Sequence, residues 1–504
     1  MKNFLKFYNK KYPPLIILVL TTVLISINLN KPFFGHHDFN ASFFSQIGKN
    51  LITYSPLDTK LGNLSGSGPL NLENFDYFVH NVPLYSWMLA LSFLIFGVGE
   101  WQARLVSVVA TIASSIVIYK ISLKLFDRLT AYLSILFFFF SAMILYFSSS
   151  VFPEPAAMLF SLLAFYFYVN WIKSGESKSF YYLMVFLFLA LLTVWSSYFL
   201  PPFLVLHYFF LKKGKNLTKI LPIILLPIAT ITAHMVHTFI LTGNLFVVEF
   251  LSVFLQRINP SSDEILQFTI FDFIRREQSL VFAYYSKATI ILVILWFLRL
   301  IYKLYKREKQ ENSLTLLILF LWGISYPLFF IQAAYIHDYF LIYLAPFIAI
   351  ASGRFLSEFA NKYRFKQKVN ILVYIWPFVF PLIQFFMIKD FAFVLINSNA
   401  SREGYYLGKL LNSNTNYQDK ILVLSGQFGA HFSVFTDFYA NRKIRYADFA
   451  CEKFNYTQPY LDYQYVVYIY KRQDTPLCTL KTLKERYSSF SNDKFEIFKI
   501  NNGQ

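Results

Sequence analysis

A polar cluster that follows the first apolar stretch combines the side chains needed for proton transfer. Residues 35–40 are Gly-His-His-Asp-Phe-Asn, so the Asp38 carboxylate directly follows the imidazoles of His36 and His37. The apolar stretch before them, residues 13–29, is preceded by four lysines within residues 2–11. Lysines stay on the cytoplasmic side of a membrane, so we expect the cluster at the opposite surface. A carboxylate there can act as a general base; the alternative is a solvated loop carboxylate.

Further candidate residues lie near the ends of later apolar stretches and, in the case of Arg257, within the polar stretch at residues 243–283. An Arg or His can neutralise a phosphate, and a carboxylate or hydroxyl can bind a polar substrate. The candidates for substrate binding are His80, Tyr85, Arg104, Glu154, Arg257, His337 and Tyr339.

Structural explanations exist for several of these residues. Arg104 can be an interfacial anchor, or can pair with Glu100 four residues earlier. Glu154 can simply complement the dipole at a helix N-terminus, and Tyr85 can belong to an interfacial aromatic belt. The sequence leaves both kinds of explanation open. Histidines in the apolar stretches, such as His207 and His234, are expected to have hydrogen-bonded packing roles.

Composition indicates a polytopic membrane protein. The chain has 504 residues, 56% of them hydrophobic, and a mean hydropathy of +0.46. Several apolar runs are long enough to span a bilayer. The net charge is +18, from 46 Lys and Arg against 28 Asp and Glu. Because much of this basic charge falls in short loops between apolar runs, topology explains it better than nucleic-acid binding, and no nucleic-acid partner is expected.

The apolar pattern predicts a fold that is mainly α, a transmembrane helical bundle within residues 1–388. About eleven spans are expected, at residues 13–30, 101–124, 129–149, 156–172, 180–196, 198–211, 220–241, 284–302, 313–332, 339–357 and 370–388. The basic loops near residues 120–128, 173–178, 212–215, 303–309 and 362–368 then share one side with the N-terminus. By the positive-inside rule, that side is cytoplasmic.

One short apolar segment, residues 83–98, decides this topology. If it crossed the membrane, Lys120, Lys124 and Arg128 would face outward and every later basic loop would change sides. We therefore expect a helix that lies along the outer surface or dips into it. Residues 31–100 then form one long outer loop, and residues 243–283 form a second.

The last segment, residues 389–504, has a different pattern. Helical periodicity alternates there with short β-like runs at residues 421–424, 465–470 and 495–500. This predicts a small extracytoplasmic α/β domain. It contains both cysteines, Cys451 and Cys478, which can pair in an oxidising compartment or remain two free thiols.

Five motifs follow one another in a recognisable order. They are His37-Asp38, His80-Asn81-Val82-Pro83-Leu84-Tyr85, Gly97 to Leu105, Pro153-Glu154-Pro155, and His337 to Pro346. Together they span about residues 10–350. This order resembles the GT-C superfamily of membrane glycosyltransferases, in the branch that contains protein O-mannosyltransferases and aminoarabinose transferases.

The resemblance implies an enzyme that takes a sugar from a polyprenyl-phosphate donor. The sugar would pass, with inversion, to a lipid, glycan or protein acceptor at the outer face of a bacterial cytoplasmic membrane, among membrane lipids. Asp38 would be the general base, and the cations of His80, Arg104 and Arg257 would stabilise the leaving phosphate. Asn81 and Val82 depart from the branch's pattern, which leaves the sugar undetermined.

The sequence identifies no certain cofactor, and a divalent metal ion is the candidate. Some members of the superfamily are associated with a divalent metal ion, and His37 and His80, with His36, are the candidate ligands here. Their spacing is not a strong metal-binding pattern.

Two other functions remain open. A transporter or a lipid or polysaccharide flippase would place essential charges at the bilayer midplane and often shows repeated halves. Here the acidic residues cluster in the expected outer loops, and the sequence has no evident repeat. A binding protein would use the C-terminal domain to capture a partner at the outer face.

Overall fold

The computed structural model describes residues 12–500, apart from residues 72–75, 213–216, 246, 260–266, 365–375, 400–401, 425–429, 448–457, 471–476 and 493. The chain forms two compact units. The first comprises Met1–Leu29, Val79–Met88 and Arg104–Ile396, and the second comprises Asn30–Phe78, Leu89–Ala103 and Asn397–Gln504. The second unit therefore combines most of the first expected outer loop with the C-terminal segment.

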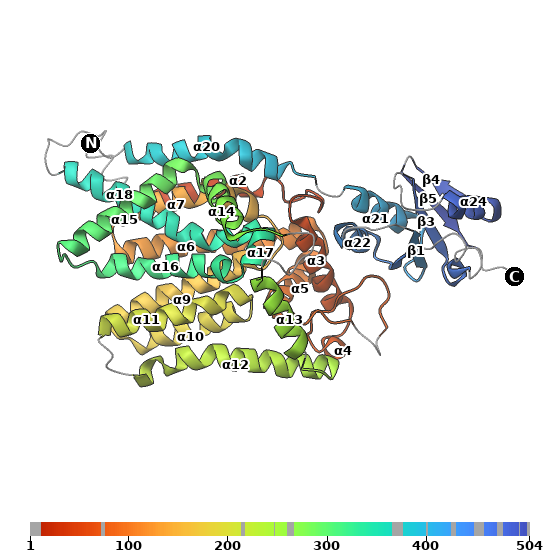
Figure 1. Cartoon of the computed structure of the whole chain (residues 1–504), viewed down its shortest axis with the longest axis horizontal. Coiled ribbons are helices and arrows are strands. Elements are labelled where there is room, and N and C mark those ends of the chain that lie inside the picture. The colour runs from red at the N-terminus through yellow and green to blue at the C-terminus, as the bar shows by residue number, and fades with distance from the viewer. Residues whose placement is uncertain are drawn as a thin grey trace. The chain divides into compact units, whose positions relative to one another are not determined.

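The first unit is a helical bundle (Figure 1). Two helices are shared between the units: α5 (Leu84–Phe96) starts in the first, and α6 (Glu100–Leu125) starts in the second. The remaining elements of the first unit are α2 (Tyr12–Ser26), α7 (Arg128–Phe139), α8 (Ala142–Phe147), α9 (Glu154–Ser174), α10 (Ser177–Leu191), η1 (Trp195–Phe199), α11 (Leu200–Lys212), α12 (Leu217–Thr242), α13 (Val247–Ile258), α14 (Ile270–Tyr285), α15 (Lys287–Tyr305), α16 (Glu311–Phe329), α17 (Ile331–Ile336), η2 (Asp338–Leu344), α18 (Ala345–Arg364), η3 (Trp376–Phe378) and α20 (Val379–Ile396).

Among the described residues, seven helices are long and apolar enough to cross a membrane. The protein is a multi-pass membrane protein, but the expected count of eleven spans is not confirmed. The expected span at residues 129–149 is divided into α7 and α8, because the Ser141 hydroxyl caps the start of α8. The expected spans at residues 180–196 and 198–211 correspond to α10 and α11, which have 15 and 13 residues. A helix of 15 residues is about 22 Å long, against about 30 Å of hydrocarbon.

The last expected span is displaced along the chain. It was placed at residues 370–388, whereas the observed helix α20 runs from Val379 to Ile396. Residues 370–375 lie outside the described part of the chain.

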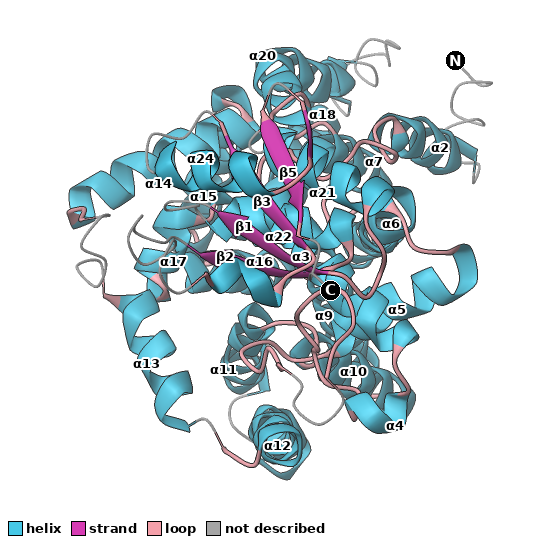
Figure 2. Cartoon of the chain, turned by 90° about the vertical axis from the view of Figure 1, so that its right-hand side faces the viewer, coloured by secondary structure: helices cyan, strands magenta, loops and turns pink. Residues whose placement is uncertain are grey.

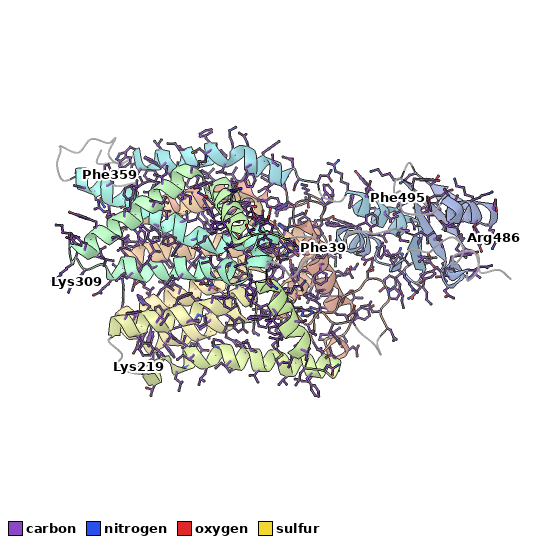
Figure 3. The ribbon with its side chains drawn as sticks, viewed as in Figure 1. Phe39, Lys219, Lys309, Phe359, Arg486 and Phe495 are labelled. Carbon is purple, nitrogen blue, oxygen red and sulfur yellow. The ribbon has the colours of Figure 1, made fainter. Side chains whose placement is uncertain are left out.

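Two lysines near the expected basic loops, Lys219 and Lys309, lie at one end of the helical bundle, together with Phe359 (Figure 3). A cluster of ion pairs also joins two helices there: Glu358 of α18 pairs with Arg299 and Lys303 of α15, and with Arg354 of its own helix. This grouping is what the positive-inside rule predicts for loops that face one compartment.

Helix α16 and the 3₁₀ segment η2 approach each other unusually closely. Gly323 makes this possible, since a Cβ atom at this position would lie 2.6 Å from the carbonyl oxygen of Tyr343. This close approach brings the Tyr343 backbone against α16, the helix that also carries Tyr326.

The expected second outer loop, residues 243–283, contains two helices, α13 and α14. Helix α14 begins with a reciprocal capping box, in which Thr269 and Asp272 each bind the other's backbone N–H. The Thr-x-x-Asp spacing is a sequence signal for a helix start. Helix α13 carries Arg257 in its last turn.

The second unit contains a five-stranded sheet in the order β2-β1-β3-β5-β4 (Figure 2). Its strands are β1 (Lys420–Leu424), β2 (Lys443–Ala447), β3 (Tyr465–Ile469), β4 (Ser489–Ser491) and β5 (Phe495–Lys499). Strands β2, β1 and β3 are parallel, and β5 and β4 are antiparallel additions. The three β-like runs of the sequence are confirmed as β1, β3 and β5. The other two were missed because β2 is a half-exposed edge strand and β4 has three residues.

Apolar side chains cover both faces of this sheet. One core includes Leu407 and Phe432, and the other includes Tyr460 and Leu483. The helical elements of the second unit are α3 (Asp38–Thr53), α4 (Pro56–Thr59), α21 (Arg402–Asn414), α22 (Ala430–Ala440), η4 (Pro459–Asp462) and α24 (Leu477–Arg486). Helix α22 packs against α3, so the C-terminal domain contacts the expected outer loop within the second unit. Cys451 and the side chain of Cys478 lie outside the described residues.

Candidate functional site

Asp38 is the first residue of α3 and is only 5% exposed. The helix starts just after His37, whose left-handed backbone (φ 58°) turns the chain into it. The Asp38 Oδ2 atom accepts hydrogen bonds from the backbone N–H groups of Phe34, at 3.1 Å, and Gly35, at 2.7 Å. The carboxylate is therefore held by its own loop and is not a solvated loop carboxylate.

A cavity of about 230 Å³ lies in the first unit. Arg257 and His80 are the two residues of its lining that can carry a positive charge. The cavity is lined by His80, Trp195, Tyr198, Phe199, Ile231, Phe250, Val253, Phe254, Arg257, Tyr326, Phe329 and Phe330. Two predicted substrate-binding residues that are far apart in the sequence are thus brought together. The cavity combines a hydrocarbon-like wall with cationic groups.

The backbone next to His80 is fixed by two ring nitrogens. Trp195 Nε1 donates a hydrogen bond to the His80 carbonyl oxygen at 2.7 Å. His234 Nε2 lies 3.0 Å from the carbonyl oxygen of Val79. His234 therefore has the hydrogen-bonded packing role expected for it. His207 has the same kind of role, since it contacts the hydroxyls of Tyr168 and Thr315.

Glu154 is the first residue of α9 and is only 3% exposed. Among the described residues, no group forms a hydrogen bond with its Oε2 atom. Three tyrosines, Tyr85, Tyr326 and Tyr343, lie within electrostatic range of this side chain. Tyr326 also accepts a hydrogen bond from Arg257, which connects the surroundings of Glu154 to the cavity wall.

Tyr85 and Arg104 are both buried, in different surroundings. The Tyr85 side chain is buried near Ser107 of α6 and Glu154, so this residue is not part of an exposed aromatic belt. Arg104 Nη1 donates to the carbonyl oxygen of Leu29 at 3.0 Å. This bond connects α6 to the end of the first apolar segment.

His337 and Tyr339 belong to an aromatic cluster at the start of η2. Their rings are 5.1 Å apart, and Tyr339 also packs on Phe147 and Phe152. Neither is among the residues that line the cavity. The intervening Asp338 accepts a hydrogen bond from Tyr284.

Helix α14 carries an ion pair near this aromatic cluster. Arg276 and Glu277 form it, with a separation of 3.1 Å. Burial raises the pKa of Glu277 to about 7, although the Arg276 guanidinium acts in the opposite direction.

Part of the chain is similar to a known protein family. Residues 80–241 match the family model of dolichyl-phosphate-mannose-protein mannosyltransferases. The structure resembles ArnT from Cupriavidus metallidurans bound to undecaprenyl phosphate, with a TM-score of 0.64 and 12% identity over 96% of this chain and 97% of that one. The chain has a GT-C fold. The resemblance in the sequence motifs is therefore confirmed.

Two further relatives extend the comparison. The oligosaccharyltransferase of Archaeoglobus fulgidus is similar at a TM-score of 0.58, with 12% identity over 91% of this chain and 70% of that one. A protein of Aquifex aeolicus described as uncharacterized is 36% identical over 95 residues, which are 19% of this chain. The chain thus spans 23% of the length of the curated relative that it matches.

The family match covers only part of the candidate site in this GT-C fold. His80, Tyr85, Arg104 and Glu154 fall within residues 80–241. The other candidates fall outside this range: Asp38, Arg257, His337 and Tyr339.

Sequence reasoning missed several residues of the cavity and its surroundings, including Trp195, Tyr326 and Tyr343. Aromatic residues are so common here, with 60 Phe and 36 Tyr, that their positions alone carry little signal. Tyr326 and Tyr343 are buried polar residues within apolar segments, which is the one feature that could have singled them out.

Proposed function

We propose that this protein is a membrane glycosyltransferase that transfers a sugar from a polyprenyl-phosphate donor to an acceptor, with inversion at the sugar. The observation that carries this proposal is the cavity, in which an aromatic wall meets Arg257 and His80. A polyprenyl phosphate has the complementary chemistry, an apolar chain that ends in an anion. ArnT, which shares the fold, has been crystallised with undecaprenyl phosphate.

The proposed reaction has one transfer step. An acceptor hydroxyl or amine attacks the anomeric carbon and forms the new glycosidic bond. The bond between that carbon and the phosphate oxygen breaks, and the polyprenyl phosphate leaves with the bonding electron pair. The acceptor's proton passes to the Asp38 carboxylate, which later releases it to water. Arg257 and His80 stabilise the negative charge that develops on the phosphate.

Glu154 would act on the donor site indirectly. It lies near Tyr326, and Tyr326 accepts a hydrogen bond from Arg257. The buried carboxylate would thereby hold the guanidinium in the orientation that a phosphate needs. Tyr85, Arg104, His337 and Tyr339 remain proposed substrate contacts, and a divalent metal held by His37 or His80 remains a proposal.

The proposed location is the bacterial cytoplasmic membrane, with the N-terminus in the cytoplasm and the C-terminal domain outside. The acceptor would be a lipid, glycan or protein at the outer face. The grouping of Lys219 and Lys309 at one end of the bundle supports this orientation. Single cysteines at these two positions should be labelled from the cytoplasmic side only.

A direct assay tests the function. The purified protein in lipid nanodiscs is given a panel of polyprenyl-phosphate sugars together with a membrane extract that supplies acceptors. The readouts are the appearance of free polyprenyl phosphate and of a glycosylated product. We expect one donor to be consumed by the wild type and not by Asp38→Asn.

The main alternative predicts a different result. A transporter or flippase would move a lipid or solute across a reconstituted bilayer with no donor consumed. Translocation without sugar loss, unaffected by Asp38→Asn, would exclude the proposed transfer reaction.

A further inference from the structure

The loop that carries Asp38 is anchored by the C-terminal domain of the second unit. The backbone N–H of Phe33 donates to the Tyr439 hydroxyl at 2.7 Å, and that of His36 donates to Ser398 Oγ at 2.7 Å. Between them, the N–H groups of Phe34 and Gly35 donate to Asp38 itself. Four consecutive amides are thus satisfied by side chains, and two of these side chains come from beyond residue 396.

Tyr439 uses its hydroxyl twice. Besides accepting from Phe33, it donates a hydrogen bond to Glu100 Oε1 at 3.0 Å. Burial raises the pKa of this hydroxyl, so it stays protonated and able to donate. A single buried oxygen therefore connects the Asp38 loop to the first residue of α6.

Ring packing supports the same anchor. Phe33 packs on Phe438 and Tyr439, with centroids 5.4 and 6.4 Å apart. Tyr405 packs on Phe34 at 5.8 Å and on Tyr439 at 4.7 Å.

A second segment of the expected first outer loop is equally close to the C-terminal domain. Ser67 Oγ donates to the Arg442 carbonyl oxygen at 2.6 Å. A Cβ atom on Gly68, whose φ is +72°, would lie 2.4 Å from the Arg442 backbone. The contact between these two parts of the second unit is therefore specific and tightly packed.

We propose that Tyr439 is a positioning residue for the reaction: its hydroxyl fixes the Asp38 loop to Glu100, and it thereby sets where the Asp38 carboxylate lies. This inference rests on the proposed function, in which Asp38 is the general base. It gives the C-terminal domain an indirect part in the reaction, because the domain supplies the hydroxyl that holds the Asp38 loop. Small displacements of a base cost large factors in rate, since proton transfer needs hydrogen-bonding distance.

The test is Tyr439→Phe in the full-length protein. This change keeps the ring that packs on Phe33 and removes only the hydroxyl. We expect kcat to fall roughly 10- to 100-fold while KM for the donor stays within about twofold. Hydrogen exchange followed by mass spectrometry should show faster exchange in the peptide that contains residues 30–36.

Tyr405→Phe is the matched control. Tyr405 belongs to the same ring cluster but contacts Phe34 and Tyr439 through its ring, so we expect wild-type kcat and unchanged exchange at residues 30–36. Wild-type kcat in Tyr439→Phe, or an equal loss of kcat in both variants, would overturn the proposal.

Two variants distinguish a failure of the proposed base, Asp38, from a failure of the positioning role of Tyr439. If Asp38→Asn retains full transfer activity, the proposed base is wrong, whatever Tyr439 does. If Asp38→Asn is inactive while Tyr439→Phe matches the wild type, the base stands and the positioning role is wrong.

Discussion

Asp38 and Glu154 are both buried carboxylates at the first residue of a helix, yet their surroundings differ. Asp38 accepts two backbone hydrogen bonds from its own loop. Glu154 has an oxygen with no partner among the described residues, and its neighbours are tyrosines. A helix N-terminus favours negative charge at both positions.

The difference indicates different tasks. Hydrogen bonds from backbone amides fix the orientation of Asp38, which suits its proposed role as the group that receives the acceptor's proton. An unsatisfied oxygen in an apolar bundle is costly, and it is retained where it serves a function. Glu154 fits a supporting role toward Arg257 and the cavity.

The largest effect that this comparison predicts is the loss of the base. Asp38→Asn should lower kcat by roughly 100- to 10,000-fold, the range for general-base catalysis. Its amide oxygen can still accept the bonds from Phe34 and Gly35, so the melting temperature should change little. Asp58→Asn, an exposed carboxylate of the same expected loop, is the control and should keep wild-type turnover. Near-normal turnover in Asp38→Asn would show that Asp38 is not the base, and the proposed difference in role between Asp38 and Glu154 would then be wrong.

The next effect concerns the cavity. Arg257→Gln should raise KM for the donor roughly 10- to 100-fold, because a hydrogen bond to a charged group is worth about 1.5–3 kcal/mol. Binding of polyprenyl phosphate, measured by isothermal titration calorimetry, should weaken by a similar factor. Arg275→Gln, which changes an exposed arginine of α14, should leave both values unchanged. Unaltered donor binding in Arg257→Gln would place the phosphate elsewhere.

Smaller effects, a gain in stability and a loss of donor turnover, are expected for Glu154→Gln. The neutral amide is less costly to bury than a carboxylate, so stability should rise by about 1–2 kcal/mol. Donor turnover should fall by roughly fivefold to tenfold, because the amide replaces the carboxyl group that faces Tyr326, the hydrogen-bond partner of Arg257. Thermal melting measures the change in stability, and steady-state kinetics measure the change in turnover. The control is Glu176→Gln, which changes an exposed acid at the start of α10 and should alter neither stability nor turnover. A loss of stability in Glu154→Gln would mean that the carboxylate is structural.

The smallest effect is a pH dependence from a third carboxylate, Asp437 of α22. Its only described hydrogen-bond donor is the Tyr446 hydroxyl, at 2.8 Å. Burial raises the pKa of Asp437 from 3.8 to about 7, although this hydrogen bond acts in the opposite direction. The folded protein therefore holds this proton more tightly than the unfolded chain.

The contribution of Asp437 to stability is fully present below about pH 4 and is lost as the pH rises through about 7. In Asp437→Asn, the melting temperature should decline less between pH 5 and pH 8 than in the wild type. Identical slopes in the two proteins would show that Asp437 has an ordinary pKa and is solvated.

Sequence patterns predicted local structure well here. Residues 421–424, 465–470 and 495–500 are strands, and each expected membrane helix has a helical counterpart among the described residues. The number of spans was less predictable, because Ser141 divides one apolar run into α7 and α8. Single polar residues in a long apolar run are common, and their effect on a helix depends on what the neighbouring chain offers them.

The site was partly predictable as well. Asp38, His80, Glu154 and Arg257 could be selected by residue type and by order along the chain. Their partners could not be selected in this way. Nothing near Phe33 in the sequence points to Tyr439, which is 406 residues away. The same holds for Tyr326, which Arg257 reaches only after α13 and α16 have packed.

The sequence by itself determined that this is a membrane protein with a small α/β domain, because hydrophobic length and periodicity are properties of neighbouring residues. It also determined the order of the GT-C motifs. Only the tertiary structure decided that Arg257 shares a cavity with His80, and that the Asp38 loop is anchored by Tyr439. Such contacts depend on how segments that are distant in the sequence pack against each other. Local hydrophobic patterns describe only neighbouring residues, so they do not predict these contacts.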